Sequence, residues 1–248
     1  MKKVIVLNKK EGETPLLSLE SFRIRHKEYK DVKITYAGRL DPMASGVLVI
    51  LAGEECKNKE KYLKLDKEYE FEVLFGLSTD TYDILGKIVK CTRQDLVQKE
   101  LEKSIKNNLK YFKGKFVQSY PLYSSKTVAG KQLFEYARGG EEVEVPEHQV
   151  EVKSLKFLKI KKITSKKLLE GIERRVSKVS GDFRQKEIIK IWQKNLKNKD
   201  NNFYTASFKI KCGSGTYVRS ISNDLGEKIG IPTLALTIVR TKVGKWRK

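Results

Sequence analysis

The sequence predicts an α+β protein with a mostly antiparallel sheet. Its clearest strand pattern covers residues 68–75, where Tyr69, Phe71, Val73 and Phe75 fall on one face and charged residues on the other. Other segments place apolar residues three or four apart, which is typical of helices with one buried face. Strand patterns outnumber helix patterns but both are present, and this combination favours α+β.

The elements follow one another along the whole chain. Thr14 and Pro15 form a typical helix start, with Thr14 as N-cap and Pro15 at the first helical position, ahead of Leu16, Leu19 and Phe22 at helical spacing. Strands are expected at residues 3–8, 47–51, 68–75, 143–152, 155–160 and 203–212. Further helices are expected at residues 54–65, 94–109, 131–138 and 218–229.

Size and charge restrict the class of protein. The chain has 248 residues, 39% of them hydrophobic, so residues 1–248 can form one domain, and we expect a monomer. The formal charge is +21, which attracts polyanions, and nucleic acid is the first candidate. An anionic membrane surface is the alternative, but no strongly basic amphipathic helix stands at a terminus.

Cofactors, metals and secretion have no support in the sequence. The cysteines Cys56, Cys91 and Cys212 are scattered, and His26 and His148 do not stand at metal-ligand spacing from them. We therefore expect no disulfide, no metal and no cofactor. The apolar runs are too short for a membrane span or a signal peptide, which predicts a cytoplasmic protein.

Residues 161–202 interrupt the strand pattern with a basic helical hairpin. Leu168, Ile172 and Val176 lie at helical spacing, and Asp182 with Gln185 resembles a capping box before the second helix. Two roles remain open for this segment: a solvated peripheral bundle, or an arm that contacts a nucleic acid.

A single carboxylate stands in the most distinctive segment, residues 36–48. Asp41 follows Gly-Arg-Leu and precedes Pro42, which disfavours helix at Asp41. Gly38 and Gly46 permit backbone angles that other residues avoid. Such a loop can present a catalytic acid, although the local residues alone favour an ordinary Asp-Pro turn at a strand entrance.

Four motifs in order resemble the pseudouridine synthases, and specifically their TruB branch. They cover most of the chain and are Leu40-Asp41-Pro42 with Ala44-Ser45-Gly46; Lys67-Glu68-Tyr69 with residues 76–83; Pro121-Leu122-Tyr123-Ser124 with residues 134–138; and residues 212–219 with Asp224-Leu225-Gly226. The resemblance implies the pseudouridine synthase fold, a large mixed sheet with flanking helices and a central RNA-binding cleft.

The resemblance also implies a site. The family's catalytic Asp corresponds to Asp41, and Tyr69 is expected to stack on the target base. A carboxylate in a cleft needs a nearby cation to remain ionised, and Arg219 is the candidate; a phosphate cradle at the Gly-Ser-Gly turn is the alternative. Tyr36 stands where the TruB branch usually has His. The remaining expected RNA contacts are Arg39, Lys67, Arg138 and Arg240.

The implied reaction is the conversion of a tRNA T-loop uridine to pseudouridine, without a cofactor and with the T-arm of tRNA as partner. A carboxylate could attack covalently or stabilise a cationic ribose in this chemistry. Whether Asp41 attacks the base or the ribose stays open. We also expect these 248 residues to lack the C-terminal PUA-type RNA-binding domain that is common in the family. Alternatives are a synthase for ribosomal RNA and a non-catalytic RNA chaperone, for which the charge alone would suffice.

Overall fold

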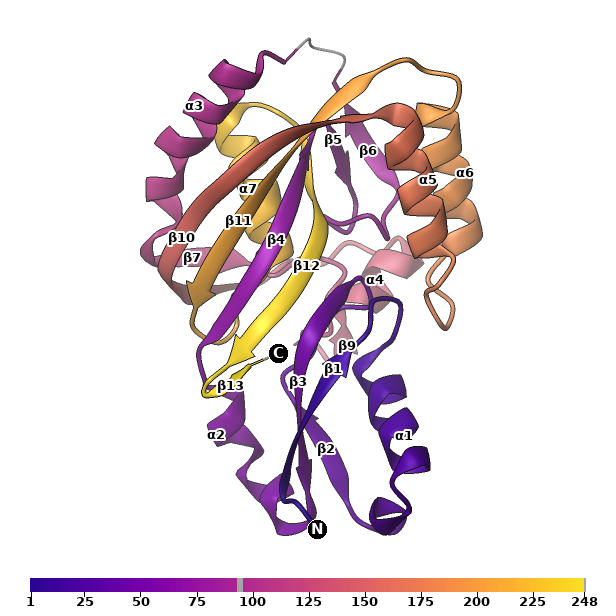
Figure 1. The fold of residues 1–248 in the computed structure, drawn as a ribbon, viewed down its shortest axis with the longest axis vertical. Coiled ribbons are helices and arrows are strands. Elements are labelled where there is room, and N and C mark those ends of the chain that lie inside the picture. Colours follow the sequence, from indigo (N-terminus) through magenta and orange to yellow (C-terminus); the bar gives the residue numbers. More distant parts are fainter. Residues whose placement is uncertain (93–95, 248) are drawn as a thin grey trace.

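A nine-stranded sheet organises the described part of the chain, residues 1–92 and 96–247, in this computed structural model (Figure 1). Its strands are β1 (Val4–Lys9), β2 (Ile34–Ala37), β3 (Ala44–Ala52), β4 (Lys67–Phe75), β7 (Gly114–Ser119), β10 (Glu147–Thr164), β11 (Asn202–Cys212), β12 (Thr233–Val243) and β13 (Trp246–Arg247). The order is β1-β3-β12-β4-β11-β10-β7, with β2 paired to β3 and β13 to β12. Only β12 and β3 pair in parallel among these strands, so the predicted α+β class with a mostly antiparallel sheet is confirmed.

Helices cover both faces of this sheet. The α-helices are α1 (Pro15–Arg25), α2 (Lys59–Leu63), α3 (Gln98–Asn108), α4 (Leu133–Gly139), α5 (Ser165–Val176), α6 (Gln185–Leu196) and α7 (Val218–Ile229). Short 3₁₀ helices lie at Lys27–Tyr29, Gly53–Asn58 and Leu109–Phe112. Two small hairpins complete the fold, β5 (Leu77–Thr79) with β6 (Ile88–Cys91) and β8 (Thr127–Val128) with β9 (Lys131–Gln132).

Alternation along β4 divides the core into two layers. Phe71 and Val73 face α3 and α7, in a cluster that also holds Ile105 and Ile221. The opposite face presents Leu74 to the α5–α6 hairpin. Because side chains of a strand point alternately to either side, one continuous apolar stretch can support both layers.

The predicted helices need several corrections. The segment 54–65 is a 3₁₀ helix followed by α2, and not one helix. The helix expected at 94–109 is α3, which begins at Gln98; its predicted start, Gln94, lies outside the described residues. Residues 131–132 of the helix predicted at 131–138 form β9, and α4 begins only at Leu133.

The two strands expected at 143–152 and 155–160 are one strand, β10. Register shifts after Val152 and Phe157 let the chain continue through the interruption that suggested a break. Residues 143–146 lie outside the strand, where Pro146 has no N–H to donate to a ladder. β10 also extends to Thr164, so the helical hairpin begins at Ser165 and not at residue 161.

The capping box predicted from Asp182 and Gln185 is wrong in its register. Arg184 is the N-cap of α6, in a left-handed conformation. The carboxylate of Asp182 accepts from the Arg184 N–H, and the side-chain oxygen of Gln185 accepts from the Phe183 N–H. The same two side chains thus stabilise a tight turn before the helix instead of its first turn.

Sequence patterns did not reveal β2, β7 and β12. The last matters most, because β12 lies between β3 and β4 and joins the two halves of the sheet. No helix within residues 1–92 and 96–247 is both long enough and apolar enough to cross a membrane.

Candidate active site

A cavity of about 1010 Å³ opens where β3, β4, β12 and the start of α7 meet. Residues far apart in the sequence line it. All eight residues that the sequence analysis proposed for the site are among them: Tyr36, Arg39, Asp41, Lys67, Tyr69, Arg138, Arg219 and Arg240. The fold therefore gathers the expected site residues into one concave space.

The Asp41 loop enters β3 at the side of this cavity, and backbone contacts fix it. The Asp41 carbonyl accepts from the Ala44 N–H at 3.0 Å, which closes the turn. The Pro42 carbonyl accepts from the Gly12 N–H at 2.9 Å and faces the Lys9 ammonium at 3.4 Å. The loop that carries the Asp41 carboxylate is therefore fixed by a hydrogen bond within its own turn and by contacts from Gly12 and Lys9.

Arg240, on β12, also fixes the Asp41 loop through hydrogen bonds to backbone carbonyls. Its side chain is only 1% exposed, and its guanidinium donates to the carbonyls of Val47 at 2.7 Å, Arg39 at 3.1 Å and Gly38 at 3.3 Å. Three satisfied carbonyl contacts favour a positioning role for Arg240. Its expected contact with RNA stays a prediction.

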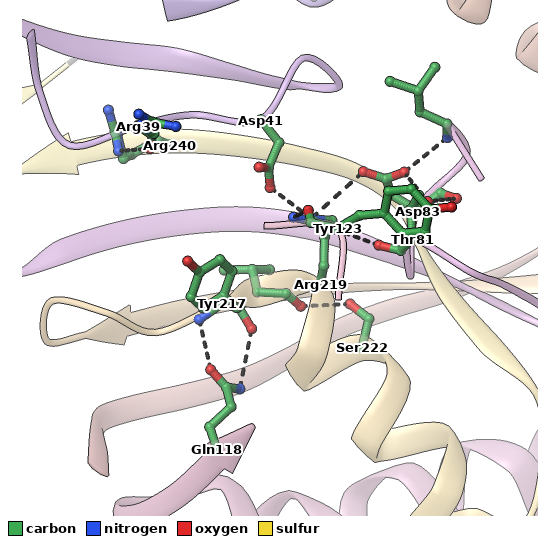
Figure 2. Close-up of polar contacts among 12 residues, drawn as sticks. Arg39, Asp41, Thr81, Asp83, Gln118, Tyr123, Tyr217, Arg219, Ser222 and Arg240 are labelled. Carbon is green, nitrogen blue, oxygen red and sulfur yellow. Dashed lines mark hydrogen bonds and ion pairs between the residues drawn. The ribbon is translucent and has the colours of Figure 1, made fainter. Parts of the chain in front are cut away.

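Arg219 forms the centre of the site with Asp41. Its Nε donates to Oδ2 of Asp41 at 2.7 Å, and its other nitrogens donate to the carbonyls of Thr81 at 2.6 Å and Tyr123 at 3.2 Å (Figure 2). A second carboxylate, Asp83, lies 3.8 Å from Nε. The Arg219 side chain is 3% exposed and that of Asp41 is 39% exposed. The cation is thus buried while the carboxylate stays open to the cavity.

Burial and charge act in opposite directions here. Burial alone would lower the pKa of Arg219, but the carboxylates of Asp41 and Asp83 raise it above its usual value, so the guanidinium stays charged. Burial raises the pKa of Asp83, and Arg219 opposes that rise. Asp83 also accepts from the Thr81 hydroxyl and the Leu85 N–H, which fix its orientation. Among the described residues, no three side chains of the metal-binding types come together.

Tyr69 and Lys67 lie on β4 at the inner wall. Tyr69 is opposite Arg240 in the β4–β12 ladder, and burial raises the pKa of its phenol, which therefore stays protonated at neutral pH. Lys67 is buried, its ammonium donates to the Leu63 carbonyl, and burial lowers its pKa to about 8. Tyr69 is thus placed to present a ring and a hydroxyl, whereas Lys67 already has a backbone partner.

The remaining predicted residues lie nearer the solvent. Tyr36 is half-buried, with the Lys59 ammonium 5.7 Å from its ring centroid. Arg39 and Arg138 are exposed. Their expected RNA contacts stay predictions, and their positions on the cavity wall are compatible with them.

Two features of the site were not predicted from the sequence. One is Lys9, which lies behind the Asp41 loop and not on the cavity wall, and whose buried ammonium also donates to the carbonyls of Lys10 and Glu13. The other is the turn between α5 and α6, which brings Phe183 and Arg184 to the cavity. Asp182 and Gln185 predicted a helix start at this turn, but nothing in the sequence indicated that Phe183 and Arg184 would line the cavity.

Comparison with known proteins identifies relatives for most of the chain. The family model described as TruB family pseudouridylate synthase (N terminal domain) matches residues 25–170, more than half of the chain. The tRNA pseudouridine synthase B of Caldanaerobacter subterraneus subsp. tengcongensis is 35% identical over 88% of this chain and 61% of its own length. The protein of that name from Lactobacillus acidophilus is 36% identical over 82% of this chain and 56% of its own length. The chain thus spans somewhat under two thirds of these relatives.

Solved structures support the fold alone. The crystal structure of a Cbf5-Nop10-Gar1 complex contains a chain with a TM-score of 0.57 and 17% identity, matched over 99% of this chain and 50% of that chain. An H/ACA RNP bound to a substrate RNA containing 2′-deoxyuridine gives a TM-score of 0.56 at 17% identity, over 99% of this chain and 48% of that chain.

Proposed function

Because this chain belongs to the TruB family of pseudouridylate synthases, we propose that it converts a uridine of tRNA, in the T-loop, to pseudouridine. The observation that carries the proposal is the Asp41–Arg219 pair, an open carboxylate on a buried guanidinium within a cavity large enough for a nucleotide. The relatives' shared name, tRNA pseudouridine synthase B, supports tRNA as the substrate.

The reaction is an isomerisation. The N1–C1′ glycosidic bond breaks, the base turns, and a C5–C1′ bond forms, while C5 loses a proton and N1 gains one. No electron carrier or phosphate donor enters this balance. Asp41 is the group at the reacting centre, since a carboxylate can bond to or stabilise an electron-poor carbon of the nucleotide.

Arg219 and Tyr69 position the carboxylate and the base. Arg219 fixes the direction of the Asp41 carboxylate, because the guanidinium that donates to it is itself held by the carbonyls of Thr81 and Tyr123. Tyr69 supplies a ring on which an extruded base can stack. The uridine must leave its own stack to reach Asp41, and a concave site beside a flat aromatic side chain accommodates it there.

The test is chemical mapping of pseudouridine after incubation with an unmodified tRNA transcript. We expect one modified position, in the T-loop. A transcript with cytidine at that position serves as the control and should gain no pseudouridine. Modification of a ribosomal RNA fragment but not of tRNA would replace the substrate, and binding without any product would favour an RNA chaperone.

A further inference from the structure

The turn of the α5–α6 hairpin, residues 177–184, is anchored beside the active site. The Ser180 N–H donates to the Gly12 carbonyl at 3.0 Å, next to the Asp41 loop. Arg175, at the end of α5, forms an ion pair with Glu11, with 2.6 Å between Nη2 and Oε2. The indole N–H of the buried Trp192 on α6 donates to the Gly86 carbonyl at 3.2 Å. The hairpin is therefore seated on the catalytic core, and its turn has a fixed place.

One guanidinium at the turn is neutralised. Arg184 pairs with Asp80, with Nη1 2.8 Å from Oδ2, and donates to the hydroxyl oxygen of Tyr123 at 2.6 Å. Its Cζ lies 4.4 Å from the centroid of the Tyr123 ring. The side chain is 19% exposed. These contacts make Arg184 an anchor of the turn, because its charge is already compensated within the protein.

A second guanidinium, that of Arg138, contacts the same turn and is not paired with a carboxylate of the described residues. Arg138, on α4, is exposed and has no carboxylate at ion-pair distance among the described residues. Its Cζ lies 5.5 Å from the ring centroid of Phe134 and 5.8 Å from that of Phe183. Its Nη2 donates to the Asp182 carbonyl at 2.9 Å. Two of these three contacts come from the hairpin turn.

We propose that the hairpin turn positions Arg138 to bind a phosphate of the RNA substrate beside the target nucleotide. A planar guanidinium binds phosphate through two parallel N–H donors, and the aromatic contacts fix its plane before RNA arrives. Fixing it in advance lowers the conformational entropy lost on binding. The hairpin thereby serves RNA binding through one oriented arginine of the core. This inference rests on the proposed function, since it takes RNA as the substrate.

The test is a double-mutant cycle on RNA affinity. Equilibrium binding of an unmodified tRNA transcript is measured at several salt concentrations for wild type, Arg138→Ala, Phe183→Ala and the double variant. Arg138→Ala should lose about tenfold in affinity and flatten the salt dependence by about 0.7 to 0.9 in log–log slope, as for one phosphate contact. Phe183→Ala changes no charge, yet it should weaken binding. The double variant should bind no more weakly than Arg138→Ala alone, because both changes remove the same contact.

Substitutions at position 183 separate orientation from packing. Phe183→Tyr keeps an aromatic face and should retain wild-type affinity. Phe183→Leu keeps apolar volume against the core cluster around Leu168, so it should remain folded but bind as weakly as Phe183→Ala. Lys190→Ala is the matched control, because Lys190 is exposed on the same hairpin and does not line the cavity. It should change affinity by less than about twofold.

Two results would overturn the inference. One is a fold-loss in RNA affinity of the double variant that equals the product of the Arg138→Ala and Phe183→Ala losses, which would show that the two side chains act independently. The other is wild-type affinity in Phe183→Leu. Pseudouridine formation by the wild type is measured in parallel. If the RNA affinities show coupling but the wild type forms no pseudouridine, the proposed function is contradicted and the phosphate site at Arg138 is supported. If the wild type forms pseudouridine but the affinities show no coupling, the proposed function is supported and the phosphate site is contradicted.

Discussion

Nε of Arg219 lies 2.7 Å from Oδ2 of Asp41, although the two residues are 178 positions apart in the sequence. Asp41 comes from the loop before β3, and Arg219 from the first turn of α7. β12 makes the meeting possible, because it pairs with β3 on one side and with β4 on the other. The strand that joins the halves of the sheet therefore also assembles the site.

Arg219→Lys should preserve the positive charge but lose the set of hydrogen bonds that orients Asp41. A lysine ammonium cannot reach Asp41, the Thr81 carbonyl and the Tyr123 carbonyl together, so it leaves a buried acceptor without a donor. We expect about 100-fold slower single-turnover conversion and a free energy of unfolding lower by about 2 kcal/mol. RNA affinity should not change. Urea unfolding and single-turnover kinetics check this, and a fully active Arg219→Lys protein would show that orientation of Asp41 is unimportant.

Tyr69→Phe removes only the buried hydroxyl. The ring remains for stacking, so RNA affinity should stay the same. We expect the hydroxyl to take part in proton transfer at the base, so the single-turnover rate should fall about 100-fold. Tyr204→Phe is the control, since Tyr204 is partly buried on β11 and does not line the cavity. Equal rates in the two variants would restrict Tyr69 to stacking.

Gly46→Ala should disrupt the contact between β3 and β12. Gly46 has φ +109°, and an added Cβ would lie 2.2 Å from the Arg240 carbonyl oxygen. Strain and overlap together should lower the free energy of unfolding by about 3 kcal/mol. Gly53→Ala is the matched control: φ is +60° and no atom lies within 4 Å of its added Cβ, so about 1 kcal/mol is expected. Similar losses in both variants, measured by urea unfolding, would argue against the overlap.

Lys9 should make the free energy of unfolding change with pH in the alkaline range. Burial lowers its pKa from 10.5 to about 8, so the unfolded chain holds this proton to higher pH than the folded protein does. The Lys9 contribution to the free energy of unfolding should therefore rise between pH 8 and pH 10.5, by up to ~3 kcal/mol. Lys9→Met lacks the proton and should lack this rise. Urea unfolding of both proteins at several pH values provides the measurement, and parallel pH profiles would contradict it.

Local patterns were enough to predict some of the site. The Asp41 loop is marked by Pro42 and its glycines, and the pairing with Arg219 followed from the resemblance of the late motif to a known family. Contacts made only by packing left no such signal. The Lys9 ammonium reaches the Pro42 carbonyl because β1 pairs with β3, and nothing in the residues around Lys9 reports that pairing.

The hairpin shows the same limit. Apolar spacing around Leu168 and Ile172 predicted two helices, and both are present. Its effect on the cavity depends on the Ser180 contact to Gly12, which joins segments far apart in the chain. β12 escaped prediction for another reason: it is an interior strand with mostly buried residues, so the apolar–polar alternation that reveals a half-buried strand is missing.

The most direct test of the proposed chemistry compares wild type with Asp41→Asn in single-turnover pseudouridine formation on an unmodified tRNA transcript. RNA affinity is measured on the same preparations. The substitution keeps the size of the side chain and removes its charge, so we predict product from the wild type, none from the variant, and tight RNA binding by both. Pseudouridine formation by Asp41→Asn at the wild-type rate would contradict the assignment of Asp41 to the reacting centre.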